Sequence, residues 1–206
     1  MRKRLSLFLI SFLILSGLYA QSSLTPDQVL DRTVRELEVG KGLEARFNIT
    51  NSGYTSKGEI ITSGHMFRVK LQDINIWYNG KDLYTYNEGT EETTVVTPTR
   101  EELLESNPLA YVTSAKNNYN VIFSTVKKSG SYVLELTPKS KRSEIKRITV
   151  TIGNSNYLPE RIVVEPKSGT PVRADITSFK KISSVSPAEF EYPKKKYPKT
   201  EIIDLR

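Results

Sequence analysis

Apolar and polar residues alternate along much of this chain. Leu43, Ala45, Phe47 and Ile49 are separated by single polar residues, and this period of two predicts a strand with one buried face and one solvated face. The segment 58–98 continues the pattern with four or five short runs rich in Ile, Val, Thr and aromatic residues, most of them closed by Gly, Asn or Asp. This segment therefore predicts a meander of antiparallel strands.

The dipeptide Asn79-Gly80 lies between two of these runs, 74–78 and 83–87. Both residues readily adopt the positive backbone angles of a tight hairpin. The sequence thus predicts a hairpin whose turn sets the register of the two strands.

Helical spacing replaces the alternation at two places. Thr25-Pro26 with Gln28 resembles a capped helix start, and Val29, Leu30, Val34 and Leu37 follow as an apolar stripe before Gly40. In the second place, a capping box at Thr99 and Glu102 precedes Leu103-Leu104, and Asn107-Pro108 restarts a second short helix containing Leu109, Tyr111, Val112 and Ala115. Helices this short are unstable alone, so we expect them to pack against the sheet or over its open end.

Strand patterns resume over 119–126, 132–137, 144–152, 159–165 and 172–179, separated by Gly-containing turns at several points. A turn about every ten residues favours a continuous antiparallel barrel or half-barrel. We expect 187–193 to be a short extended segment, followed by a Pro- and Lys-rich turn and a final apolar pair, Ile202-Ile203.

The N-terminus has the features of an export signal. Three basic residues, Arg2, Lys3 and Arg4, precede an apolar run over 5–18, and Leu18-Tyr19-Ala20 resembles a cleavage site. A membrane anchor is the alternative, but the run is shorter than the roughly 20 residues that a spanning helix needs. We therefore expect a signal peptide at 1–20, cleavage near Ala20-Gln21, and one mature domain over 21–206.

Composition excludes several classes of function. The chain has no Cys, which rules out disulfides, thiolate metal sites and the lipidated cysteine of a bacterial lipoprotein. Loss of the three basic residues of the signal lowers the net charge from +7 to +4, which is too small and scattered to predict nucleic-acid binding.

Residues suited to catalysis are scarce. His65 is the only histidine and lies at a predicted turn, so it is more readily explained as a solvated loop residue than as a general base. The adjacent acidic pairs Glu91-Glu92 and Glu101-Glu102 diverge in either a strand or a helix, which does not suit a glycosidase dyad. We therefore predict no enzyme activity, no catalytic or metal-binding residues and no cofactor.

The aromatic residues concentrate in the predicted strands. A curved sheet with an apolar face either fills that face with side chains or leaves a cavity for a ligand, and composition alone leaves both alternatives open.

Several motifs in this order resemble those of the LolA family of periplasmic lipoprotein carriers. The matching segments are Gly58-Glu59-Ile60 with Phe67-Arg68-Val69, the hairpin from Asn79 to Tyr86, the strand from Tyr132 to Lys139, and the close from Phe190 to Pro193 and Ile202 to Asp204. Tyr84 stands where the family usually has Trp. Ser63-Gly64-His65 stands where the best-known members have an Arg-Pro pair that helps to hold a helical lid.

This resemblance implies a fold that is mainly β with some α: an unclosed antiparallel β-barrel, or half-barrel, with helices covering the concave apolar face. It also implies a periplasmic, monomeric carrier that binds the acyl chains of lipoproteins, receives them from an inner-membrane exporter and delivers them to an outer-membrane acceptor. A carrier of another lipid or glycolipid and a non-catalytic structural β-protein remain alternatives.

The expected lipid contacts are the bulky apolar residues of the strand faces and inserted helices. They are Phe47, Phe67, Trp77, Tyr84, Leu103, Leu104 and Leu109. Leu83 and Tyr84 are neighbours in a strand, so only one of the two can point inward.

Overall fold

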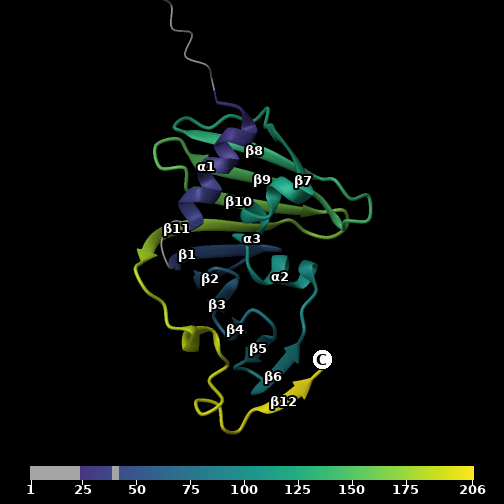
Figure 1. The fold of residues 1–206 in the computed structure, drawn as a ribbon. Helices are drawn as coiled ribbons and strands as arrows, with labels where there is room; N and C mark the ends of the chain where they lie inside the picture. Colours follow the sequence, from purple (N-terminus) through teal and green to yellow (C-terminus); the bar gives the residue numbers. More distant parts are fainter. Residues whose placement is uncertain (1–23, 39–41) are drawn as a thin grey trace, which may run out of the picture.

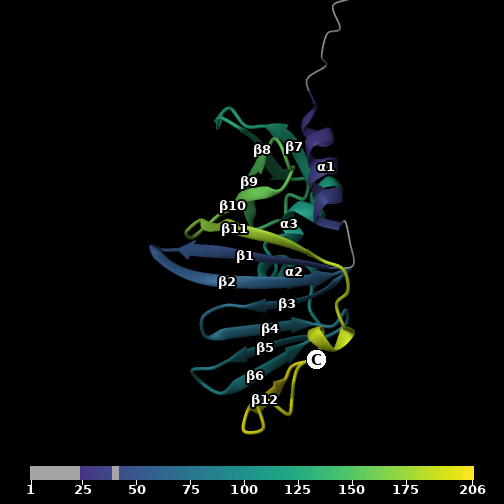
Figure 2. The ribbon, with the colours of Figure 1, turned by 90° about the vertical axis from the view of Figure 1, so that its left-hand side faces the viewer.

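The structure is a computed structural model that describes residues 24–38 and 42–206. The expected signal peptide and the expected helix end at Gly40 lie outside the described residues. Within the described part of the chain, twelve strands form a single open sheet, and the helices lie against it (Figures 1 and 2). The predicted fold class, a mainly β half-barrel with covering helices, is confirmed.

The strands follow the predicted order along the chain. They are β1 (Gly42–Asn51), β2 (Tyr54–Ser63), β3 (Met66–Lys70), β4 (Ile74–Tyr78), β5 (Leu83–Asn87), β6 (Glu92–Val96), β7 (Tyr119–Phe123), β8 (Ser131–Pro138), β9 (Ile145–Gly153), β10 (Pro159–Pro166), β11 (Val172–Ile182) and β12 (Glu201–Asp204). The helices are α1 (Pro26–Glu38), α2 (Arg100–Ser106), α3 (Ala110–Thr113), α4 (Ala115–Asn118) and the 3-10 helix η1 (Pro187–Phe190).

The order across the sheet is β12-β6-β5-β4-β3-β2-β1-β11-β10-β9-β8-β7. Neighbouring strands are antiparallel except β12, which pairs parallel with β6. The pairing of β1 with β11 joins the two halves of the sheet, and its register shifts between Arg46 and Phe47. Because β12 and β7 are the two edges and do not pair with each other, the barrel is unclosed.

We call the face whose side chains share the main apolar core with the helices the inner face, and the opposite one the outer face. On the inner face, Ala45, Ile60, Val69 and Ile76 are consecutive cross-strand partners from β1 to β4. On the other half of the sheet, Ile162, Val150 and Leu134 are partners in the same way, from β10 to β8. The core therefore runs continuously across the sheet, because cross-strand partners on one face are in contact.

Helix α1 begins as predicted. The Thr25 hydroxyl accepts a hydrogen bond from the Gln28 backbone N–H at 3.2 Å, and the Gln28 side chain accepts one from the Thr25 N–H at 3.0 Å. This reciprocal capping satisfies two N–H groups that an uncapped helix leaves without partners. Its stripe of Val29, Leu30 and Leu37 is buried in the core. No helix in the described ranges is both long and apolar enough to cross a membrane.

The hairpin at Asn79-Gly80 has the predicted strands and register, with Tyr78 opposite Leu83. Its turn is longer than expected: the loop spans 79–82, and of the predicted pair only Gly80 has a positive φ, of 97°. Asn79 instead accepts hydrogen bonds with its side-chain oxygen from the backbone N–H groups of Lys81 and Asp82, at 3.0 and 2.9 Å. Asn79 therefore stabilises the turn as an acceptor rather than through a left-handed backbone.

The C-terminal segment differs from the prediction of an extended stretch. Ser186 caps the 3-10 helix η1, with Pro187 at its start, and the chain then crosses the outer face of β4 and β5 before it ends as strand β12. Tyr192 and Tyr197 contact Trp77, with ring centroids 5.5 and 6.0 Å apart. The tail thus forms a second, smaller aromatic core on the outer face.

Candidate functional site

The helices between β6 and β7 cover part of the inner face. We call residues 99–118, which contain α2, α3 and α4, the lid. The predicted capping box is present: the Glu102 N–H donates to the Thr99 hydroxyl at 3.2 Å, and the Thr99 N–H donates to the Glu102 carboxylate at 2.6 Å. These hydrogen bonds lower the pKa of Glu102, because they favour its charged form.

The second part of the lid starts at Asn107, as the sequence indicated. Its side-chain oxygen accepts a hydrogen bond from the Leu109 N–H at 2.9 Å. The predicted single helix is divided into α3 and α4 at Ser114. Two helices of 4 residues each are too short to be stable alone, so the shape of the lid depends on what it packs against.

The lid packs against the sheet mainly through apolar side chains. Leu104, Leu109, Tyr111 and Val112 are all buried in the main core, with Val112 fully buried. Burial raises the pKa of Tyr111 to about 12, since the phenolate is poorly solvated there. The inner face is therefore filled by the lid in this structure.

Polar contacts attach only one end of the lid to its surroundings. At α4, the Lys116 ammonium pairs with Asp31 of α1 at 2.8 Å, and the Lys139 ammonium donates to the Lys116 carbonyl at 2.9 Å. Within the described part of the chain, α2 has no hydrogen bond or ion pair to the sheet. Its attachment consists of the apolar contacts of Leu104 and of the half-buried Leu103. The two ends of the lid are thus held by different kinds of interaction.

Four of the predicted lipid contacts come together in the core. Phe47 of β1, Phe67 of β3, Leu104 and Leu109 all belong to it, and Leu103 packs against it. Their positions follow from strand alternation for the two phenylalanines and from the lid for the three leucines. Contact with a lipid stays a prediction for all five.

Trp77 and Tyr84 lie on the other side of the sheet. They are cross-strand partners, so they share a face, and Tyr84 stacks on Tyr192 of the tail at 5.3 Å. The inner-face positions of this hairpin are instead occupied by Tyr78 and Leu83. The tail therefore separates Trp77 and Tyr84 from the space beneath the lid.

Sequence reasoning missed Tyr78, which is the cross-strand partner of Phe67 with the two rings 5.3 Å apart. It also left Tyr119, which is buried at the start of β7, out of the expected site. The predicted hairpin register contained the signal for Tyr78, since it put Leu83 opposite Tyr78 and thus on the same face.

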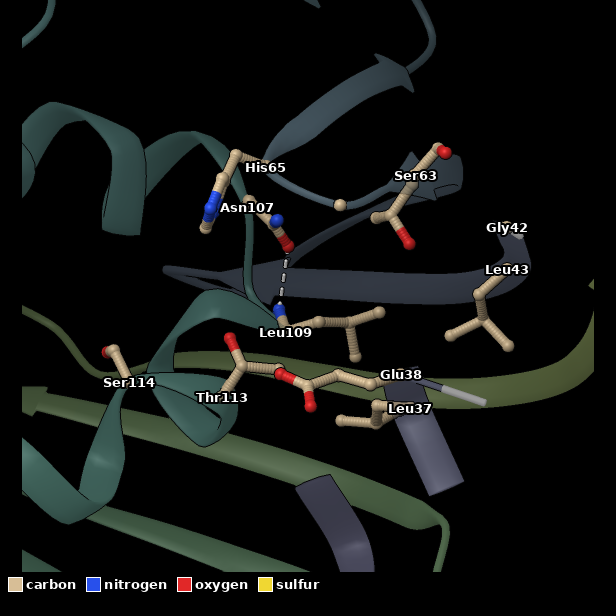
Figure 3. A pocket seen from close by; sticks show the side chains of 12 residues that line it. Leu37, Glu38, Gly42, Leu43, Ser63, His65, Asn107, Leu109, Thr113 and Ser114 are labelled. Atoms are coloured by element: carbon tan, nitrogen blue, oxygen red, sulfur yellow. Dashed lines mark hydrogen bonds between the residues drawn. The ribbon is translucent and has the colours of Figure 1, made fainter. Parts of the chain in front are cut away.

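A first cavity of about 490 Å³ opens between the end of α1, the start of β1 and the lid (Figure 3). Leu37, Leu43 and Leu109 form its apolar base, and all three belong to the core. His65 lines this cavity from the β2–β3 turn and lies beside Asn107 of the lid. His65 has no hydrogen bond or ion pair with any described residue, so it does not latch the lid in place of the family's arginine.

A second cavity, of about 510 Å³, opens at the far side of the lid, between α2, the start of β7 and the β8–β9 loop. Leu104, Tyr111, Tyr119 and Ile145 form its apolar base. Burial raises the pKa of Tyr119, as it does that of Tyr111. The lid is thus flanked by two openings that lead to the same apolar core.

Comparisons with known proteins agree with this architecture. The model of a family described as outer membrane lipoprotein carrier protein LolA matches residues 15–167. An uncharacterized conserved protein from Thermus thermophilus has a similar structure, with a TM-score of 0.59 and 12% sequence identity, over 86% of this chain and 98% of that one. A DUF1329 family protein from Desulfovibrio piger has a TM-score of 0.51 and 14% identity, over 82% and 98% of the two chains.

At these identities the two structures support the fold alone, and no curated protein matches the chain. The family model, in contrast, covers well over half of the sequence. The chain therefore belongs to the family of the outer membrane lipoprotein carrier protein LolA.

Proposed function

We propose that this protein carries the acyl chains of lipoproteins between the lid and the inner face of the sheet. In this proposal it works in the periplasm, after cleavage of residues 1–20. It receives lipoproteins from an exporter of the inner membrane and delivers them to an acceptor of the outer membrane. Membership of the family supports a lipid or lipoprotein carrier or binding role, and the transfer between membranes is the finer step that we infer.

The observation that carries this proposal is the unequal attachment of the lid. Its α4 end is tied to α1 by the ion pair between Lys116 and Asp31, whereas α2 contacts the sheet through apolar side chains only. Apolar contacts are not directional, so an acyl chain could replace those of Leu104 without leaving a polar group unpaired. This arrangement favours opening at α2 with α4 as the fixed end.

The energetics of lipid transport fit such a site. Each methylene group hidden from water contributes about 0.8 kcal/mol, so a lipoprotein with two or three acyl chains needs an apolar carrier to cross an aqueous compartment. A carrier must also release its cargo. Exchange of lid contacts for lipid contacts keeps the net affinity low, because each lipid contact costs a lid contact.

We propose Phe47, Phe67, Leu103, Leu104 and Leu109 as the lipid contacts. Their test is photo-crosslinking to a bound lipoprotein, with a crosslinker in place of Phe67 and, as the matched control, in place of Tyr84. Phe67 belongs to the core beneath the lid, whereas Tyr84 stacks on the tail. We expect products from position 67 and few from position 84, and equal yields from both would contradict this choice of face.

The transport function is tested in cells. After depletion of the protein, we expect outer-membrane lipoproteins to accumulate at the inner membrane, as measured by membrane fractionation and immunoblotting. Re-expression of the wild-type chain should restore their distribution. Normal sorting after depletion, in a strain without a second copy, would refute the proposal.

The two alternatives make different predictions. A carrier of another lipid or glycolipid would co-purify with that molecule, which mass spectrometry after gentle isolation would identify. A structural β-protein with a permanently filled core would take up no apolar fluorescent probe, so uptake of such a probe would exclude it.

A further inference from the structure

The second cavity combines an apolar base with charged groups at its rim. Tyr119 and Ile145 lead inward to Leu104 and Tyr111, which belong to the core beneath the lid. Its volume of about 510 Å³ lies within the range of roughly 300–1,000 Å³ that is typical of small-molecule sites. The base has the character of a site for an apolar chain.

Cations surround the opening of this cavity. Arg100 of α2 lines it on one side, and Lys139 and Arg142 of the β8–β9 loop line it on the other. Lys141 and Lys167 lie next to them, since the Lys167 ammonium donates to the Lys141 carbonyl at 3.0 Å. The rim thus brings together five cations from three separate segments of the chain.

These five cations lack carboxylate partners. None of them has a carboxylate oxygen within 4.0 Å among the described residues, although Arg68, Arg147 and Arg161 elsewhere on the sheet are paired. Three carboxylates, of Glu101, Glu105 and Glu144, also line the cavity. The rim therefore keeps an excess of positive charge that the protein itself does not neutralise.

The first cavity offers a useful contrast. Its ionisable lining residues are Glu38 and His65, and no Lys or Arg is present among the described residues that line it. The two openings lead to the same core but differ in the charge at their rims. A ligand with an anionic head and an apolar chain would therefore distinguish between them.

We propose that the second opening binds the phosphate-bearing headgroup of an anionic lipid, with an acyl chain over Tyr119 and Ile145. The guanidinium groups of Arg100 and Arg142 suit a phosphate, because they can donate two parallel hydrogen bonds to it. The apolar base favours a lipid over a free phosphate. This inference rests on the proposed function, in that the acyl chain enters the same space beneath the lid.

The test is calorimetric titration of the exported protein, purified from cells, with three probes. Dihexanoyl phosphatidylglycerol has the anionic head and the chains, dihexanoyl phosphatidylcholine has no net charge, and glycerol phosphate has no chains. At low salt we expect the phosphatidylglycerol to bind most tightly, and its advantage over phosphatidylcholine to shrink at high salt as the charges are screened. Equal affinity for the two lipids at low salt would overturn the proposal, and equal affinity for glycerol phosphate would overturn its lipid part.

The double variant Arg100→Gln/Arg142→Gln locates the site. Two exposed ion pairs contribute an amount that corresponds to about a 2- to 30-fold change in affinity, so we expect a loss of that size for phosphatidylglycerol and little change for phosphatidylcholine. The matched control is Lys57→Gln/Lys81→Gln, which removes the same charge from positions away from the cavity. An equal loss in both double variants would show a general charge effect and refute the site.

Uptake of an uncharged apolar fluorescent probe separates this inference from the proposed function. If the probe enters but the preference for the anionic lipid is absent, only the headgroup site is wrong. If neither the probe nor any lipid binds, the carrier function itself is refuted.

Discussion

Replacement of Leu104 by Asp tests whether the lid moves independently of the sheet. Leu104 is only 8% exposed and is the one fully packed apolar residue of α2. Truncation of a well-packed leucine costs about 2–5 kcal/mol, and a carboxylate at this position adds a desolvation cost. We therefore expect Leu104→Asp to hold α2 away from the sheet, to reduce uptake of acyl chains and to leave the strands folded.

Native-state hydrogen exchange measures this effect residue by residue. If closure of the lid loses about 2–5 kcal/mol, exchange of its amides should be faster by roughly 30- to 3,000-fold. The reporting amides are those of Asn107, Val112 and Ser114, which donate to carbonyls within the lid. The amides of strand β8 should keep their protection.

The control for this variant is Val126→Asp, which places the same charge on a side chain that is 68% exposed. We expect its exchange pattern to match that of the wild type. A loss of protection across the whole sheet in Leu104→Asp would mean that the lid is an inseparable part of the core. In that case the idea of a lid that opens at α2 is wrong.

Three further predictions concern other parts of the fold. Tyr192→Ala removes the tail's stacking on the outer face and should lower the free energy of unfolding by about 1–3 kcal/mol, with a red shift of the single tryptophan's emission; unchanged emission in urea titrations would contradict this. Gly58→Ala places a methyl group 2.4 Å from the Phe47 ring and should cost about 1–3 kcal/mol in the same assay, whereas no change would mean that the ring moves freely. Hydrogen bonds from Arg206 hold the pKa of Asp204 at about 2, below its ordinary value of 3.8; this pair stabilises the fold above pH 3.8 and is lost as the pH falls towards 2, so Asp204→Asn should be less stable at neutral pH and converge with the wild type in acid melts.

Local signals in the sequence predicted the elements well. Both capping boxes, at Thr25 and Thr99, have the expected hydrogen bonds, because a cap involves residues only three positions apart. The register of the hairpin around Asn79 was also correct, since the runs on either side fix which residues face each other. In these cases the information lies within one element or its immediate neighbour.

The faces of β4 and β5 could not be predicted in the same way. In Ile74–Tyr78 both alternating sets contain large apolar side chains, so a period of two does not identify the inner face. The outer face is dry because Tyr192 and Tyr197 cover it from a segment more than 100 residues away in the chain. For the same reason, the pair Ile202-Ile203 gave no indication that β12 would run parallel to β6.

The connection from β6 to β7 has a mechanical consequence. β6 lies next to one edge of the sheet and β7 forms the other edge, so the lid acts as a tether across the opening of the half-barrel (Figure 1). If the edges spread apart, this tether must lengthen, and it can do so by unwinding helix: the 7 residues of α2 would gain roughly 12 Å on passing from helical to extended backbone. Curvature of the sheet and helix content are thus linked, and bulkier cargo should leave fewer helical residues, as circular dichroism would record.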